Sequence, residues 1–379
     1  MDIETQTLIR LFRQMLRIRT FEERVGELFL KGGTAGSMLH LSFGEESAAV
    51  GVGEAMHSGD GFTTHHRGHG IFLARGADPK KMMAEIGGKE DGYCRGKGGS
   101  MHIADNDLGH LGANAIVGGG ISHVVGAGLS YQYLGKDQAA VAFFGDGAMQ
   151  QGGLYESMNL AALWKLPVMF VCINNEYGMG TRLDRASASL EFAKRAETFG
   201  LNGLEVDGLD VTQVHHKAQK LMEKVRNGSP AFLKVNCYRF HGHARKDKSH
   251  YREDSEEQKG REKDSILHLE NQLIEGYSVT TENLEQIKLE IDNEMDEAME
   301  YALNSTEPES IERFQDVYAP GSPEPLPVDE RIRKALNTSP VVGTKLSRNM
   351  IAVQSTISAI ETTSILLTIS NFSLQITLT

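Results

Sequence analysis

Residues 141–181 read VAFFGDGAMQQGGLYESMNLAALWKLPVMFVCINNEYGMGT, and two apolar runs in this stretch flank a segment with helical periodicity. The first run, Val141–Phe144, has no polar alternation, which predicts a strand buried on both faces of a parallel sheet. Leu154 and Met158 follow at helical spacing, and the second run, Val168–Ile173, ends at a pair of asparagines. The stretch therefore predicts a strand, a helix and a second strand parallel to the first.

Polar residues follow each of these strands. Asp146 lies after the first and Asn175 after the second, and a right-handed crossover brings both strand ends to the same sheet edge, where open α/β sheets bind ligands. Carboxylate, amide and backbone carbonyl oxygens suit Mg²⁺. We expect Gly147 and Ala148 to open the helix, whose free N–H groups favour an anion. The pattern thus predicts a site for Mg²⁺ and a diphosphate.

The rest of the chain continues the alternation of strands and helices. An amphipathic helix is expected from Leu8 to Phe29, and Glu205–Gly208, Val211–Arg226 and Ala231–Tyr238 indicate a strand, a helix and a strand. Two surface helices are expected between residues 256 and 303. The predicted fold class is α/β, a doubly wound, mostly parallel sheet with helices on both faces, followed by C-terminal helices.

Longer motifs resemble a known family. Gly145-Asp146-Gly147 followed by Asn174-Asn175 resembles the thiamine diphosphate signature. The segments GKGGSMHIAD, GANAIVGGG, NLAALWKLPV and NNEYGMGT are similar to the alpha subunit of the E1 component of 2-oxo acid dehydrogenase complexes, in the pyruvate and acetoin branch. The resemblance indicates a thiamine-diphosphate-binding domain over residues 1–328 and leaves 329–379 as an atypical tail of unknown role.

This resemblance implies an activity and its partners. The expected reaction is the oxidative decarboxylation of pyruvate, or another small 2-oxo acid, with acyl transfer to the lipoyl domain of E2. Acetoin dehydrogenase E1 alpha is the alternative. The implied assembly is α₂β₂, and the chain should be inactive without its beta subunit, because in this family the beta chain supplies the glutamate that activates the cofactor.

The resemblance also implies roles for individual residues. Arg67 aligns with an arginine that contacts the diphosphate, and the main chain around Ala115 and Val117 hydrogen-bonds the aminopyrimidine. His243 matches a histidine near the diphosphate, where an imidazole can donate to an anion or assist proton movement. Together with His69 it is a candidate catalytic residue. The implied ligands of Mg²⁺ are Asp146, Asn175 and the Tyr177 carbonyl, with Gly147 and Ala148 beside the diphosphate.

Other readings of the histidines and of the site remain open. His65, His66 and His69 invite a zinc interpretation but lack further ligands at suitable spacing, and His66 stands where the pyruvate enzymes often have tyrosine. The pair in His241-Gly242-His243 is also found in metal-dependent hydrolases, which need more ligands than are evident here. A scaffold without activity is disfavoured because Asp146 and Asn175 are both present.

Composition excludes several classes of protein. The formal net charge of −12 argues against general nucleic-acid binding, and no apolar run reaches the roughly 18 residues of a membrane span. The three cysteines are widely separated, which fits a reducing compartment. The acidic start, MDIETQ, lacks the features of a signal or transit peptide, so a cytoplasmic location is expected, with an already processed form as the alternative.

Overall fold

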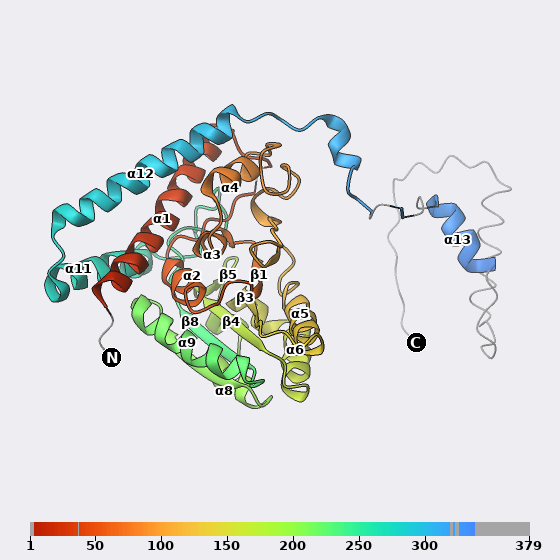
Figure 1. Ribbon diagram of the computed structural model, residues 1–379, viewed down its shortest axis with the longest axis horizontal. Helices are drawn as coiled ribbons and strands as arrows, with labels where there is room; N and C mark the ends of the chain where they lie inside the picture. The colour runs from red at the N-terminus through yellow and green to blue at the C-terminus, as the bar shows by residue number, and fades with distance from the viewer. Residues whose placement is uncertain (1–3, 37, 319–320, 323–325, 338–379) are drawn as a thin grey trace. The chain divides into compact units, whose positions relative to one another are not determined.

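The computed structural model of the chain describes residues 4–36, 38–318, 321–322 and 326–337 (Figure 1). The chain divides into two units, Met1–Arg313 and Phe314–Thr379. Helix α13 (Val328–Asn337) belongs to the second unit, and all other elements named below belong to the first. Most of the tail expected at 329–379 lies outside the described residues.

The first unit is organised around a six-stranded sheet in which every pair of neighbouring strands is parallel. The strand order is β2 (His110–Asn114), β1 (Gly61–His65), β3 (Ala140–Gly145), β4 (Val168–Asn174), β8 (Ala231–Asn236) and β7 (Asn202–Asp207). The chain passes from β1 to β2 on one side and then to β3 on the other. The carboxyl ends of β1 and β3 therefore form a topological switch point, the place where such sheets bind ligands.

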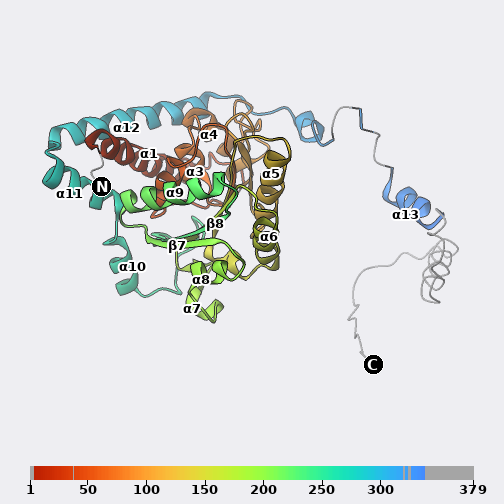
Figure 2. The ribbon, with the colours of Figure 1, turned by 60° about the horizontal axis from the view of Figure 1, so that its bottom comes forward.

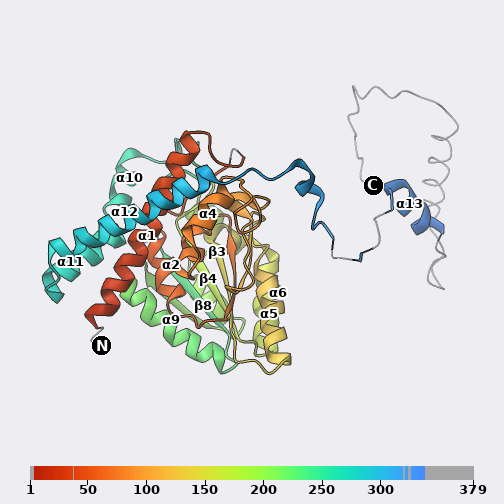
Figure 3. The ribbon, with the colours of Figure 1, turned by 45° about the horizontal axis from the view of Figure 1, so that its top comes forward.

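Side chains of the central strands alternate between two buried cores, which is why their sequences are apolar throughout. In β3, Val141 and Phe143 belong to one core, whereas Ala142 and Phe144 belong to the other. Helices α5 (Ile121–Tyr133), α6 (Gly152–Leu163) and α8 (Phe192–Glu197) cover the second core. The first core packs under α1 (Thr5–Leu30), α2 (Glu46–Gly53) and α9 (Val211–Arg226), and Figures 2 and 3 show the sheet between these two helix layers.

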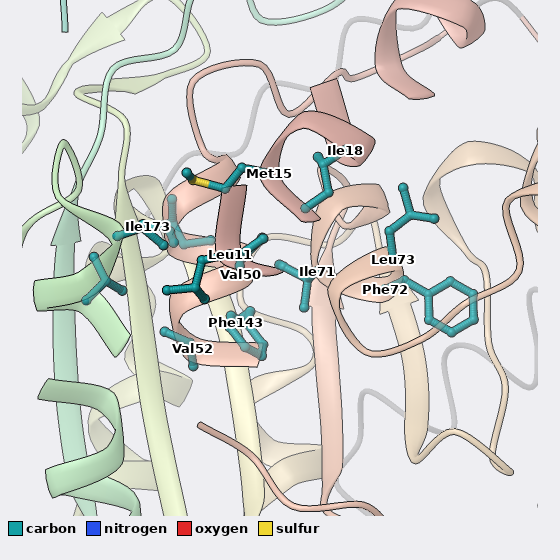
Figure 4. Packing of buried hydrophobic residues seen from close by; sticks show 14 of the residues in the cluster. Leu11, Met15, Ile18, Val50, Val52, Ile71, Phe72, Leu73, Phe143 and Ile173 are labelled. Atoms are coloured by element: carbon teal, nitrogen blue, oxygen red, sulfur yellow. The ribbon is translucent and has the colours of Figure 1, made fainter. Parts of the chain in front are cut away.

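Residues of the first core pack helix α1 against the sheet and against the helices near the C-terminal end of this unit. Figure 4 shows Leu11 and Met15 of α1 beside Val50 of α2, with Phe143 and Ile173 of the sheet close by. Instead of the two expected surface helices, the described residues 254–304 form three, namely α10 (Asp254–Arg261), α11 (Ser265–Tyr277) and α12 (Thr281–Asn304), and the last two each bury one apolar face in this core. The fold class expected from the sequence is confirmed.

One expected boundary near the site is wrong. Gly147 and Ala148 do not open an α-helix but lie in the 3₁₀ turn η2 (Asp146–Gln150), and α6 begins only at Gly152. The reason is Gln151, whose extended backbone (ψ 129°) interrupts the helical path and places this residue in the wall of a cavity. Within the described residues, no helix combines the length and apolar character that crossing a membrane requires.

Candidate functional site

A cavity of about 500 Å³ opens at the carboxyl edge of the sheet, at the switch point between β1 and β3. Its walls come from the segments that follow β1, β2, β3, β4 and β8, together with His40 and Met101, so residues far apart in the sequence meet there. The predicted site residues that line it are Arg67, Ala115, Val117, Asp146, Gly147, Ala148, Asn175, Tyr177 and His243.

Asp146 is a buried carboxylate with an unused ligand position. Its side chain is only 2% exposed, and its Oδ2 atom has no hydrogen-bond partner. Burial raises the pKa of Asp146 to about 6, although backbone N–H groups of Asp146 and Asn175 and the charge of Arg239 act in the opposite direction. An orphaned anionic oxygen is costly unless a cation completes it, so the atom is suited to a metal ion.

Asn175 is held in a fixed orientation beside Asp146. Its Nδ2 donates to Oε1 of Glu45 at 2.6 Å, and its Oδ1 accepts from the backbone N–H of Tyr177 at 3.3 Å. Because the amide nitrogen is committed to Glu45, the oxygen is the atom available to a cation. Glu45 is itself buried, its Oε2 has no partner, and burial raises its pKa to about 7.

The Tyr177 carbonyl, the third predicted ligand atom, also has a fixed direction. Glu176 adopts φ +74°, a left-handed conformation that turns the chain after β4, and Nη1 of Arg239 donates to the Tyr177 oxygen at 3.1 Å. A carbonyl oxygen has two lone pairs, so this hydrogen bond leaves one for a cation. Burial, followed by the charge of Arg67, lowers the pKa of Arg239 to about 10, and its guanidinium stays charged.

Arg67 supplies a positive charge in the wall of the same cavity. Its guanidinium donates to the carbonyl oxygens of Leu41 and His243, each at 2.9 Å, and its Nε lies 3.6 Å from Oε1 of Glu45. The side chain is 3% exposed, and these contacts fix its fork of donors in one place. A preorganised guanidinium of this kind suits a phosphate group.

The structure does not bring His69 into the cavity. Its Nδ1 lies 3.0 Å from Oε2 of Glu22 and its Nε2 lies 3.0 Å from Oγ of Ser100, and all three residues are buried. Burial alone lowers the pKa of His69, but the charge and hydrogen bond of Glu22 outweigh it and raise the pKa. Both ring nitrogens are thus engaged, and this position supports a role in holding the Ser100 loop rather than the catalytic role expected from the sequence.

Glu85, which the sequence reasoning missed, organises the glycine-rich loop next to the cavity. It lies in α4 (Pro79–Ile86), is fully buried, and accepts hydrogen bonds of 2.7–2.9 Å from the backbone N–H groups of Cys94, Gly96, Gly98 and Gly99. The loop leads directly to Met101 in the cavity wall. The Glu85 carboxylate therefore accepts the backbone hydrogen bonds that a helix or sheet would otherwise accept in this segment.

Glu85→Gln should lower the free energy of unfolding by about 2–5 kcal/mol, because the glutamine NH₂ group faces N–H donors that then lose their acceptor. Urea unfolding followed by circular dichroism measures this change. Glu223→Gln, the same substitution at an exposed position of α9, is the matched control and should leave the midpoint unchanged. Equal midpoints for Glu85→Gln and the parent chain would contradict the assigned role.

The sequence does not predict three further residues of the site. His40 lines the cavity, Glu45 accepts from Asn175, and Arg239 donates to the Tyr177 oxygen. Glu45 gave no signal in the sequence that could have identified it, because Glu46 and Ser47 follow it directly and the segment resembles an ordinary helix start. Its approach depends on Gly44, which has φ +89° and where a Cβ atom would lie 2.0 Å from the Tyr238 oxygen. That requirement becomes visible only once β8 is placed.

Most of the chain is similar to known proteins. Residues 13–311 match the family described as dehydrogenase E1 component. The chain is 41% identical over 320 residues to the alpha subunit of acetoin:2,6-dichlorophenolindophenol oxidoreductase from Bacillus subtilis (strain 168), covering 84% of this chain and 95% of that protein.

Two further relatives represent both branches of the resemblance. The alpha subunit of the pyruvate dehydrogenase E1 component from Rhizobium meliloti (strain 1021) is 39% identical over 311 residues, which covers 82% of this chain and 89% of the relative. The acetoin:2,6-dichlorophenolindophenol oxidoreductase alpha subunit from Cupriavidus necator is 39% identical over 320 residues, covering 84% and 96%. The similarity therefore spans nearly the whole length of these alpha subunits.

Proposed function

Because the chain belongs to the dehydrogenase E1 component family, whose members depend on thiamine diphosphate, we propose that it is the alpha subunit of an E1 enzyme that oxidatively decarboxylates pyruvate or a similar 2-oxo acid. The observation that carries this proposal is the orphaned Asp146 oxygen beside the oriented Asn175 amide, in a cavity that also contains the fixed Arg67 guanidinium.

The residues present fit Mg²⁺ and the cofactor. The Asp146 carboxylate, the Asn175 amide oxygen and the Tyr177 carbonyl form a set of hard oxygen donors, which is the type that Mg²⁺ prefers. Arg67 would neutralise and orient the diphosphate, and the main chain at Ala115 and Val117 would receive the aminopyrimidine. When bound, thiamine diphosphate supplies the carbanion chemistry needed to break the bond between a carboxylate and a carbonyl carbon.

His243 has the protonation state required of a donor to an anion. Burial, together with the charge of Arg67, lowers its pKa to about 3, so the ring is neutral at pH 7. Its Nδ1 lies 3.4 Å from Nη2 of Arg67, which can only donate, and the ring proton is therefore assigned to Nε2. From this position His243 can donate a hydrogen bond to the diphosphate or to a substrate oxygen.

Acetoin oxidation is a second candidate, and the similarity to the Bacillus subtilis and Cupriavidus necator alpha subunits favours it. Pyruvate and acetoin are both small carbonyl compounds, and the cavity of about 500 Å³ does not favour one substrate over the other. The choice between them depends on groups that line the substrate pocket, and part of that pocket is proposed to come from a second chain.

The exposed apolar residues at the cavity rim support a beta subunit as that second chain. Ile116, Val117 and Met179 are 72%, 48% and 66% exposed, and the last two line the cavity. Exposed apolar side chains gathered at one site are typical of protein interfaces. We propose an α₂β₂ assembly that passes its acyl group to a lipoyl domain of E2, and the cytoplasmic location stays a prediction.

The proposal predicts that the purified chain has no 2-oxo acid turnover by itself. Addition of its beta subunit, thiamine diphosphate and Mg²⁺ should restore turnover, measured with an artificial electron acceptor on pyruvate, acetoin, 2-oxobutyrate and branched 2-oxo acids. Mixtures that lack only the cofactor, or only the beta subunit, are the controls. Turnover by the isolated chain would contradict the two-chain arrangement, and a reconstituted complex inactive on every substrate would contradict the proposed function.

A further inference from the structure

Three histidines from separate segments meet in the wall of the cavity. His40 precedes α2, His66 follows β1 and His243 follows β8, and one ring nitrogen from each lies within 4.8 Å of those of the other two. The ring of His40 is 4.6 Å from both His66 and His243, measured between centroids. His241, the other histidine of the His-Gly-His sequence, is not part of this cluster and packs on Phe43 instead.

The protonation of His40 is fixed by its second contact. Its Nδ1 lies 2.8 Å from the backbone carbonyl oxygen of His243, and because a carbonyl can only accept, Nδ1 carries the proton. The lone pair of His40 is therefore on Nε2. A histidine that ligates a metal has this arrangement, with one ring N–H donated to a carbonyl or carboxylate and the other nitrogen free for the ion.

The three imidazoles are chemically different from the other metal candidate in the cavity. Burial is the main cause that lowers the pKa of all three rings, so they are neutral at pH 7. His40 offers the lone pair of Nε2, whereas His243 can coordinate an ion through Nε2 only after its ring proton moves to Nδ1, which gives up the 3.4 Å contact with Nη2 of Arg67. Neutral imidazoles suit Zn²⁺, Cu²⁺ and Ni²⁺, whereas the oxygens of Asp146 and Asn175 suit Mg²⁺. The cavity thus holds two donor sets with opposite metal preferences.

The cost of bringing an ion to the cluster is moderate. Tetrahedral Zn–N bonds of about 2.1 Å require nitrogen separations of roughly 3.4 Å, so side-chain rotation must shorten the present separations, which are within 4.8 Å, by up to about 1.4 Å. The positive charges of Arg67 and Arg239 act on the cluster and oppose an ion there, and they are partly offset by the carboxylates of Glu45 and Asp146. His66 and His243 are half-buried, which leaves a path from solvent for the ion.

We propose that His40, His66 and His243 bind one Zn²⁺-class transition-metal ion, at a site separate from the Asp146–Asn175 pair. Three protein nitrogens leave a fourth position for water or an anion, as in other three-histidine sites. A consequence rests on the proposed function: because His243 and Arg67 are needed for the diphosphate, an ion on the cluster should weaken cofactor binding.

Metal titration of the cofactor-free, tag-free chain tests the site. Co²⁺ should bind with a stoichiometry near one and give the visible absorption of a tetrahedral nitrogen-ligated ion, and Zn²⁺ should displace it. His66→Phe and His40→Phe should each weaken binding at least about tenfold, while His241→Gln is the matched control and should not. Circular dichroism establishes that each variant is folded. Unchanged Co²⁺ binding in folded His66→Phe and His40→Phe would overturn the proposal.

Two further measurements separate this site from the proposed function. Asp146→Asn should retain Co²⁺ absorption, and its loss would overturn the claim that the two sites are distinct. Thiamine diphosphate binding with Mg²⁺, measured by calorimetry on the chain assembled with its beta subunit before and after Zn²⁺ loading, tests the consequence. Absence of cofactor binding before loading would count against the proposed function alone, whereas equal binding before and after would overturn the competition.

Discussion

Asp146→Asn should weaken Mg²⁺-dependent binding of thiamine diphosphate by at least about 100-fold in the chain assembled with its beta subunit. The expected size follows from metal sites in general, where loss of even an outer-shell partner costs 10–100-fold in affinity. Here the change removes the only formal charge among the three proposed ligands, and with it the unpaired Oδ2. Isothermal titration with the cofactor at fixed Mg²⁺ measures the effect.

Asp207→Asn is the matched control for this experiment. Asp207 ends β7 at the same edge of the sheet, is exposed and accepts from the backbone N–H of Leu209 at 3.0 Å. It lies outside the cavity walls, so its substitution should leave cofactor affinity unchanged. Comparable affinity in the Asp146→Asn complex and the parent would show that the metal site is misplaced.

Without Mg²⁺, Asp146→Asn should stabilise the chain at neutral pH. The pKa of Asp146 is raised from 3.8 to about 6 in the folded state, so between these values the folded chain binds more protons than the unfolded chain. The free energy of unfolding must therefore fall as the pH rises through this window. The cost reaches roughly 3 kcal/mol above pH 7, and the asparagine variant avoids it.

Urea unfolding of both proteins at pH 4 and pH 7.5 measures this difference. The two should be nearly equal at pH 4, where the folded carboxyl group is neutral, and should differ most at pH 7.5. Added Mg²⁺ should narrow the difference by binding only the folded parent. A difference independent of pH would contradict the assignment of a buried, unpaired carboxylate.

The central part of this site could be predicted from the sequence because it depends on local pattern. Apolar runs fix β3 and β4, a parallel crossover fixes their relative direction, and the residues directly after them must then share an edge. Asp146 and Asn175 were found in this way. Arg67, Ala115, Val117 and His243 came only from resemblance to a family, and the structure places them in the same cavity.

Other parts could not be predicted because they depend on tertiary contacts. Strands β1 and β2 carry histidines and glycines instead of an apolar run, so periodicity does not reveal them. In the sequence, Glu45 and Glu85 resemble ordinary carboxylates at helix ends. Only the folded structure shows that Glu45 accepts from the Asn175 amide and that Glu85 accepts from backbone N–H groups. His69 was singled out by its neighbours in sequence, but the first turn of α3 (His69–Ala74) directs it toward Glu22.

The most direct test of the site is the position of the metal ion itself. Crystals of the chain with its beta subunit, grown with thiamine diphosphate and with Mn²⁺ in place of Mg²⁺, allow the ion to be located by anomalous scattering. We predict one Mn²⁺ bound by the Asp146 carboxylate, the Asn175 amide oxygen and the Tyr177 carbonyl. A cofactor-bound complex in which the ion lies elsewhere and Asp146 has no metal contact would contradict this site.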